Sequence, residues 1–69
     1  MNKDFSNRVR MLRHERRWSQ AELAEPVGCA QTTIGGIEAE RRGASMTLLV
    51  KIANALNVST DYLLTGRNG

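Results

Sequence analysis

The sequence predicts an all-α fold of five short helices joined by short connections. Apolar residues recur at intervals of three and four, which is the period of one helical face. No segment alternates apolar with polar residues as a half-buried strand does, and the aromatic content, at 4 %, is low for a sheet protein. Residues that start helices (Ser) and end them (Gly, Asn) separate the periodic segments. Together these three observations predict helices throughout.

The first two helices are expected before residue 28. One face of the first carries Phe5, Val9, Leu12 and Arg16, and Asp4 or Ser6 is the candidate cap. The second starts at a capping box, Ser19-Gln20-Ala21-Glu22, in which Ser19 and Glu22 satisfy each other's free amide groups. Gly28 supplies the left-handed conformation that ends a helix. Because Pro26 cannot donate to the carbonyl of Glu22, we expect a kink or an early end there.

Three more helices are expected after Gly28. Residues 30–39 resume the helical period, with Ile34 and Ile37 on the buried side. After a loop over residues 41–44, Ser45 caps a fourth helix and Asn57 ends it. The apolar stripe of this helix is Leu48, Leu49, Ile52, Ala53 and Leu56. Ser59 caps a fifth helix, whose apolar residues precede Gly66.

Length and composition limit what such a chain can do. Its 69 residues allow one domain, 1–69, with a core over about residues 5–65 and short flexible ends. Ten Lys and Arg against seven Asp and Glu give a net charge of +3, which suits a polyanionic partner. One His, no Gly-rich phosphate loop and no Cys/His cluster exclude an enzyme, a metal site and a small-molecule cofactor. The lone Cys29 and the absence of a long apolar run favour a reducing, cytoplasmic setting without a membrane.

The segment 20–39 is the informative feature, because a helix, a tight Gly-containing turn and a second helix follow each other. This arrangement leaves the second helix exposed, with a radius that fits the major groove of DNA. On a helical wheel Ile34 and Ile37 point inward, and the outward face holds Thr32, Gly35 and Gly36, with Gln31 at its margin. Gln31 suits bidentate pairing with adenine, and Thr32 can contact either type of base. We therefore expect residues 31–39 to read double-stranded DNA, with Gln31, Thr32, Gly35 and Gly36 at the base edges.

In these motifs the chain resembles the Cro/C1-type (XRE-like) helix-turn-helix regulators, which include the lambdoid phage repressors. The similarity covers about residues 5–65 and rests on Val9-x-x-Leu12-Arg13, Trp18-Ser19-Gln20-Ala21-Glu22-Leu23-Ala24, Val27-Gly28, Thr33-Ile34-x-x-Ile37-Glu38 and Leu49-x-x-Ile52-Ala53-x-Ala55-Leu56-Asn57-Val58-Ser59. It implies a compact five-helix lambda-repressor-like DNA-binding domain, whose helix-turn-helix is formed by the second and third helices.

The resemblance also implies roles for individual residues. Gln20 would bond a phosphate and support Gln31, which reads a base, while Thr32 reads the next one. Arg13 and Glu38 would form a partly buried ion pair that holds the fold. The residues expected at DNA phosphates are Gln20, Arg10, Arg41, Arg42 and Thr33.

Besides Pro26, four residues depart from the family pattern. Gly35 and Gly36 lie inside the recognition helix, where each lowers helix stability by roughly 0.5–1 kcal/mol relative to Ala. Gly36 also removes a contact that the family usually makes, so base reading should depend on Gln31 and Thr32. Arg17 and Glu40 stand where the family favours glycine, and strain is expected at both.

Taken together, the sequence predicts a bacterial or phage-encoded, nucleoid-associated transcriptional regulator. We expect a repressor that binds a palindromic operator as a homodimer, with half-sites about 34 Å apart. Activation is the open alternative, because nothing in the sequence distinguishes the two. The resemblance places dimer contacts toward the carboxyl end, and the candidates are Val58, Tyr62 and Leu63. The alternative is a protein–protein interaction module, antitoxin-like or a scaffold, that keeps this fold but reads DNA weakly.

Overall fold

The computed structural model describes residues 3–67 and, within that range, contains five α-helices and no strand. The helices are α1 (Lys3–Glu15), α2 (Gln20–Val27), α3 (Gln31–Glu38), α4 (Met46–Leu56) and α5 (Thr60–Thr65). The predicted all-α class is therefore confirmed. The flexible ends that the sequence predicts fall on residues 1–2 and 68–69, outside the described residues.

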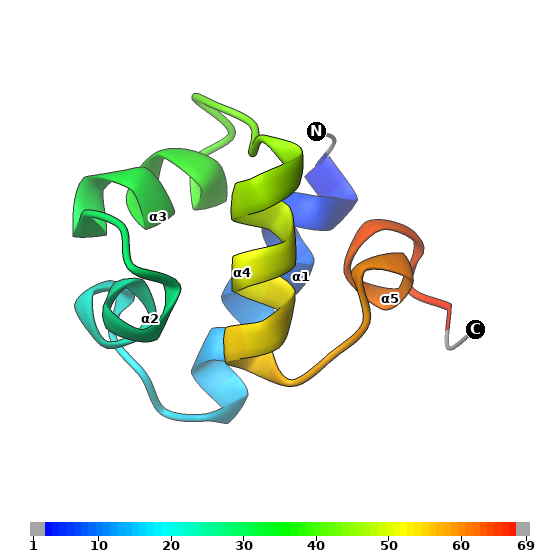
Figure 1. The fold of residues 1–69 in the computed structure, drawn as a ribbon, viewed down its shortest axis with the longest axis horizontal. Coiled ribbons are helices and arrows are strands. Elements are labelled where there is room, and N and C mark those ends of the chain that lie inside the picture. The colour runs from blue at the N-terminus through cyan, green and yellow to red at the C-terminus, as the bar shows by residue number, and fades with distance from the viewer. Residues whose placement is uncertain (1–2, 68–69) are drawn as a thin grey trace.

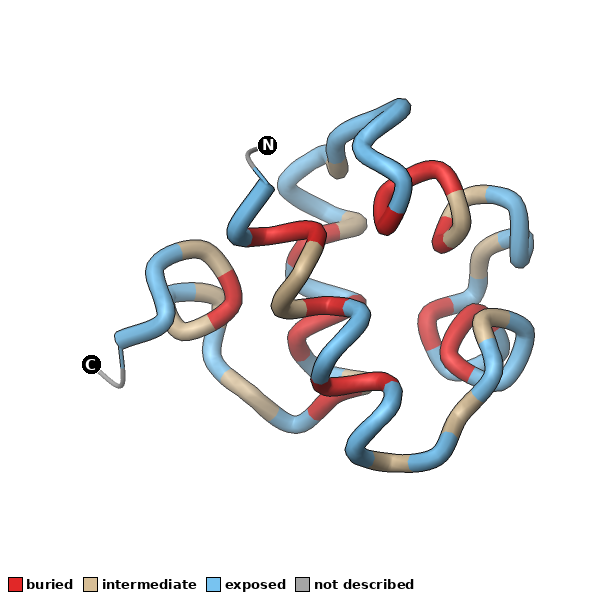
Figure 2. The backbone as a smooth tube through the Cα atoms, turned by 180° about the vertical axis from the view of Figure 1, so that it is seen from behind, coloured by how far each residue is buried: buried red, intermediate tan, exposed pale blue. Residues whose placement is uncertain are grey.

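The helices α1 and α4 cross at the centre of the molecule, with α2 and α3 on one side and α5 on the other (Figure 1). Helix α2 packs on α3 and α4, whereas α1 contacts α3 and α5. The buried segments of all five helices turn toward this centre (Figure 2). The largest fully buried side chains are Phe5, Val9, Leu23, Ile34, Ile37, Ile52, Leu56 and Leu63.

The serine caps predicted for α2, α4 and α5 are present. The Glu22 N–H donates to Ser19 Oγ at 3.1 Å, and the Ser19 N–H donates to Glu22 Oε1 at 2.8 Å, which completes the capping box. Ser45 and Ser59 likewise accept the N–H three residues ahead, at 3.2 and 2.9 Å. Helices α2, α4 and α5 end on left-handed residues, namely Gly28, Asn57 and Gly66. Local sequence signals therefore set these boundaries.

The prediction that Ser6 caps the first helix is wrong. Helix α1 already begins at Lys3, so Ser6 lies inside it, and its side chain is buried. Its hydroxyl donates to the carbonyl oxygen of Ile37 at 2.7 Å. A serine that looks like a cap in the sequence thus ties α1 to the last turn of α3.

The early end expected at Pro26 is also wrong. Helix α2 continues through Pro26 to Val27 and ends at Gly28, whose N–H donates to Ala24 O at 2.8 Å. Because the proline lies in the last turn, it removes the donor of only one carbonyl, that of Glu22. Glu22 is exposed, so water can take the place of that donor.

The strain expected at Arg17 and Glu40 is present in the backbone. Arg17, between α1 and α2, has φ 58°, and Glu40, after α3, has φ 62°. Each non-glycine residue in this left-handed region costs roughly 1–2 kcal/mol. The two turns that bound the helix-turn-helix therefore hold strained residues.

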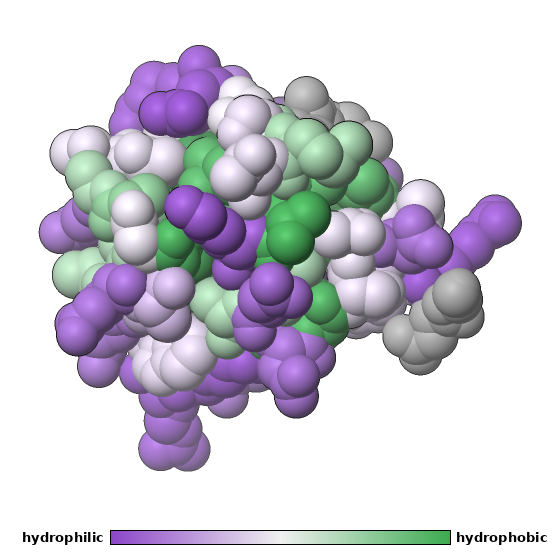
Figure 3. Space-filling view, viewed as in Figure 1, coloured by the Kyte–Doolittle hydropathy of each residue, from purple (hydrophilic) through white to green (hydrophobic). Residues whose placement is uncertain are grey.

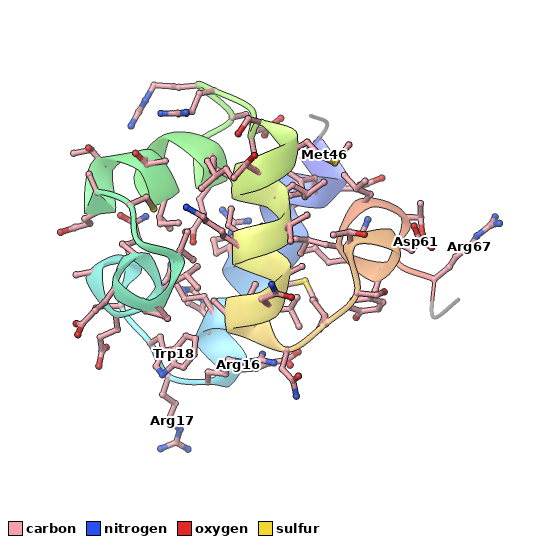
Figure 4. The ribbon with its side chains drawn as sticks, in the orientation of Figure 1. Arg16, Arg17, Trp18, Met46, Asp61 and Arg67 are labelled. Carbon is pink, nitrogen blue, oxygen red and sulfur yellow. The ribbon has the colours of Figure 1, made fainter. Side chains whose placement is uncertain are left out.

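Arg8 in α1 and Arg16, the residue that follows α1, each hold a distant backbone carbonyl. Arg8 donates to Leu63 O at 3.0 Å and to Leu64 O at 3.2 Å, which attaches α1 to α5. Arg16 donates to Leu12 O at 2.9 Å and to Leu56 O, next to the carboxyl end of α4 (Figure 4). These two arginines therefore help to hold the fold together.

Candidate nucleic-acid interface

Helix α3 is fixed from within and exposed on its outer side. Ile34 and Ile37 are 0 % exposed and anchor it in the core, while Gln31 and Thr32 at its amino end are exposed. The residue before it, Ala30, makes no side-chain cap, so the N–H groups of the first turn lack a side-chain acceptor. The outer amino end of α3 therefore offers polar groups on a rigid support.

The turn between α2 and α3 is tight because Gly28 adopts φ 80° and Cys29 follows it directly. Cys29 is half-buried and packs against the core. Burial raises the pKa of its thiol, and the nearby positive charges of Arg42 and Lys51 lower it by less. The thiol thus stays protonated near neutral pH and serves packing rather than nucleophilic chemistry.

The predicted ion pair between Arg13 and Glu38 is present and bidentate. Arg13 Nε donates to Glu38 Oε2 at 2.7 Å, and Nη2 donates to Oε1 at 2.9 Å. The two side chains are only 9 % and 5 % exposed. The hydrogen bond to Glu38 raises the pKa of Arg13 although burial lowers it, so the guanidinium stays charged. Its Nη1 also donates to Trp18 O at 2.7 Å, which ties α1 to the start of the helix-turn-helix.

Gln20 extends this network toward the outer face of α3. Its Nε2 donates to Glu38 Oε1 at 3.3 Å. Its Oε1 lies 3.1 Å from the position that a Cβ on Gly35 would occupy. Within residues 3–67 no hydrogen bond joins Gln20 to Gln31, although the family resemblance implies such support. The missing side chain of Gly35 lets Gln20 lie flat against α3 and reach Glu38 instead.

The helical wheel places Gly35 and Gly36 outward, but neither is fully exposed. Gly35 is half-buried beneath Gln20, and Gly36 is buried. What covers Gly36 is the aliphatic part of Arg42, a residue six positions further along the chain. The expectation that Gly36 is open to solvent is therefore wrong, because a wheel cannot show a side chain that folds back from the following loop.

Arg41 and Arg42 lie together in the loop that follows α3, and both are exposed. Their N–H groups donate to Gly36 O at 2.8 and 3.3 Å, which bends the loop back over the end of α3. In the space-filling view, hydrophilic side chains gather at this end of the molecule (Figure 3). Two positive charges therefore flank the outer face of α3.

Arg10 and Thr33 are the remaining candidates for phosphate contact. Arg10 is exposed and donates to Asn7 Oδ1 at 2.8 Å. It lies four residues after Ser6 and three before Arg13, so it shares the face of α1 that contacts the end of α3. Thr33 is half-buried beside the exposed Thr32. Arg10 is thus placed to extend the positive edge of the interface.

The predicted dimer residues divide into two groups. Leu63 is 0 % exposed in the core, so its assignment to a dimer interface is wrong. Val58 and Tyr62 are half-buried and pack partly against the core. Two exposed apolar residues that were not predicted lie one turn apart on α4, Met46 at 75 % and Val50 at 41 % exposure. Both lie off the buried stripe of that helix, which is the signal that could have found them.

Among residues 3–67 no group of three His, Cys, Asp or Glu side chains could hold a metal ion. Within this range no helix has the length and apolar content required to cross a membrane.

Comparison with known proteins agrees with this geometry. A family described as helix-turn-helix matches residues 9–63. The control protein C.SmaI of Serratia marcescens is 38 % identical over 61 residues, covering 88 % of this chain and 73 % of the relative. The uncharacterized transcriptional regulator YobD of Bacillus subtilis is 37 % identical over 60 residues, covering 87 % of this chain. This chain spans only 54 % of the length of YobD.

Comparison with a solved structure also indicates a helix-turn-helix regulator. The crystal structure of the P22 c2 repressor in complex with a synthetic operator superposes with a TM-score of 0.88 at 29 % sequence identity. The alignment covers 96 % of this chain and 100 % of the repressor chain. The helices and the turn described above thus take the same arrangement as in a repressor whose structure contains DNA.

Proposed function

The chain belongs to the helix-turn-helix family, in its Cro/C1 (XRE) type, and from this premise we propose that it is a sequence-specific transcriptional repressor. Its recognition helix, α3, enters the major groove of double-stranded DNA. The protein binds a palindromic operator as a homodimer, in the cytoplasm and in association with the nucleoid. The family and the relatives compared above are regulators, not enzymes, as expected from the sequence.

One observation carries the proposal. Gln31 and Thr32 are exposed at the amino end of a helix that two fully buried isoleucines anchor. A glutamine at this place can form two hydrogen bonds to an adenine edge, and a threonine can contact a neighbouring base. Arg41, exposed in the loop after α3, supplies charge for a flanking phosphate. A rigid helix with such an end fits the width of the major groove.

The homodimer follows from the symmetry of a palindromic site. Two copies that each read one half-site need recognition helices about 34 Å apart. Val58 and Tyr62 remain the candidates for the contact between copies. Both lie in the carboxyl-terminal part of the chain, away from α3.

The proposal is tested by selection from a random duplex library at about 0.1 M salt. We expect enrichment of a palindrome whose half-sites lie one helical turn apart. Enrichment of a single half-site would overturn the homodimer but keep base reading. Absence of any enrichment would overturn the proposal and favour the protein–protein interaction module.

Salt dependence separates these two functions independently. With about six phosphate contacts per dimer, log K should fall with log salt at a slope of about −5. The steep slope arises because each neutralised phosphate releases counterions. A flat dependence would contradict DNA binding through the arginines that flank α3.

Replacing Gln31 by alanine should weaken binding to the selected site by about 1–3 kcal/mol and relax the preference at one base pair. The change removes a bidentate contact but leaves the anchoring isoleucines untouched. Fluorescence anisotropy on the selected site and its single-base variants measures both effects. Asn54→Ala, which removes an exposed amide on α4, is the matched control and should change neither. An equal loss on every sequence would contradict the base-reading role.

Replacing Arg41 by alanine should weaken all sequences alike and lower the magnitude of the salt slope by about 1. A phosphate contact carries charge but no sequence information. The measurement is a series of binding titrations at several salt concentrations. Arg67→Ala is the control, because this exposed arginine lies beyond α5, far from α3 (Figure 4). A slope unchanged in Arg41→Ala would remove Arg41 from the interface.

A further inference from the structure

The outer face of α3 carries a side chain that does not belong to the helix. If Gly36 had a Cβ, it would lie 3.1 Å from Cγ and 3.2 Å from Cδ of Arg42, so the aliphatic part of Arg42 occupies that place. Gly36 itself is buried for this reason, while Arg42 remains exposed. The loop after α3 thus returns a long cationic side chain to the surface of the recognition helix.

The backbone holds Arg42 in this place. The N–H groups of Arg41 and Arg42 both donate to Gly36 O, at 2.8 and 3.3 Å, so the loop is fixed to the residue that its side chain covers. The guanidinium makes one hydrogen bond, from Nε to Gly43 O at 3.3 Å, and among the described residues it has no ion-pair partner. Its terminal nitrogens are therefore available to a ligand.

The angular position of residue 36 around the axis of α3 decides which part of the DNA the guanidinium of Arg42 can reach. Successive residues turn by about 100° around a helix, so Thr32 and Gly36 point within about 40° of each other. A helix in the major groove directs its outer side to the base edges, whereas its flanks meet the phosphates. Arg42 lies on the same side as Thr32, whose exposed side chain points outward.

We propose that Arg42 is a base-reading residue, which crosses Gly36 and places its guanidinium on a guanine in the major groove. The proposal deepens the proposed function and rests on it. Arginine pairs with guanine O6 and N7 through two parallel hydrogen bonds. Helix α3 has no side chain of its own at positions 35 and 36, and Arg42 supplies one from outside. The glycine at position 36 is what leaves room for it.

The test compares the base preferences of variants by in vitro selection and by binding to single-base variants of the selected duplex. The wild type should select a guanine at one position of each half-site. Arg42→Ala should reduce discrimination at that position alone by between about 5-fold and about 150-fold. Gly36→Ala should reduce discrimination at the same position by less than Arg42→Ala does, because its methyl group forces the aliphatic part of Arg42 to move by a small distance. The double variant Gly36→Ala/Arg42→Ala should lose little more than Arg42→Ala alone.

Two controls make the result specific. Arg41→Ala should weaken all sequences alike, and Gly35→Ala places the same methyl group against Gln20 instead of Arg42, so it should keep the guanine preference. If Arg42→Ala weakens every sequence equally, Arg42 contacts a phosphate and the inference is overturned. If the wild type selects no sequence, the proposed function itself fails, and the two failures are thereby distinguished.

Discussion

Replacing Glu38 by alanine should lower the free energy of unfolding by about 3–5 kcal/mol. The loss arises because Arg13 stays in place, 9 % exposed, with a charge that no carboxylate then compensates. Glu38 also accepts a hydrogen bond from Gln20, so the same change frees the side chain nearest the outer face of α3. For a domain of 69 residues this loss is close to the whole stability, and much of the protein should be unfolded at 25 °C.

Urea denaturation followed by circular dichroism measures this effect. Glu25→Ala removes an exposed glutamate from α2 and should change the free energy of unfolding by less than about 0.5 kcal/mol. The double replacement Arg13→Met/Glu38→Leu should restore most of the lost stability, because an apolar pair of similar volume leaves no buried charge. A loss below about 1 kcal/mol for Glu38→Ala would show that water reaches Arg13 easily.

Replacing Ile34 by alanine should cost about 2–5 kcal/mol. The side chain is 0 % exposed and anchors α3 between α1 and α2, so its removal leaves a cavity that the surrounding helices fill only in part. Because α3 has only eight residues, it depends on this packing more than on its own helix propensity. We therefore expect weaker binding of all DNA sequences as well as lower stability.

Ile34→Val is the graded control, since it removes one methylene group and should cost about 0.5–1.5 kcal/mol. Thermal unfolding compares the three proteins, and binding is measured at a temperature where each is folded. Equal losses of stability in Ile34→Val and Ile34→Ala would mean that the surrounding helices close around the smaller side chains. In that case the buried isoleucine would not be what fixes the recognition helix.

The sequence predicted correctly the exposure of two candidate site residues that belong to α3 itself. Gln31 and Thr32 stand at the exposed amino end of α3, as a helical wheel predicts. The family resemblance predicted the ion pair of Arg13 and Glu38. The structure adds that this pair is bidentate and buried. The side chains of Gln20 and Arg42 were harder to place, because each lies over a glycine of α3 from a different segment. A helical wheel represents one isolated helix, so it cannot show side chains that reach this helix from other segments.

The sequence by itself determined the five helices and the ends of α2, α4 and α5. Capping serines, the left-handed residues that end helices and the apolar period act within about four residues, so they need no tertiary contact to be recognised. For this reason the capping box at Ser19 and the stops at Gly28 and Asn57 were predicted correctly. The family resemblance, in which glycine is favoured at both places, identified Arg17 and Glu40 as strained turn residues.

Only the tertiary structure decided the partners of polar side chains that reach another helix. Ser6 bonds Ile37 O instead of capping α1, Arg8 holds the end of α5, and Leu63 packs in the core and not between copies. Arginine and serine can each bond any carbonyl that the fold brings within reach, and their own sequence neighbourhood does not specify which one. The crossing of the helices selects that carbonyl, and with it the side chains that remain free to meet DNA.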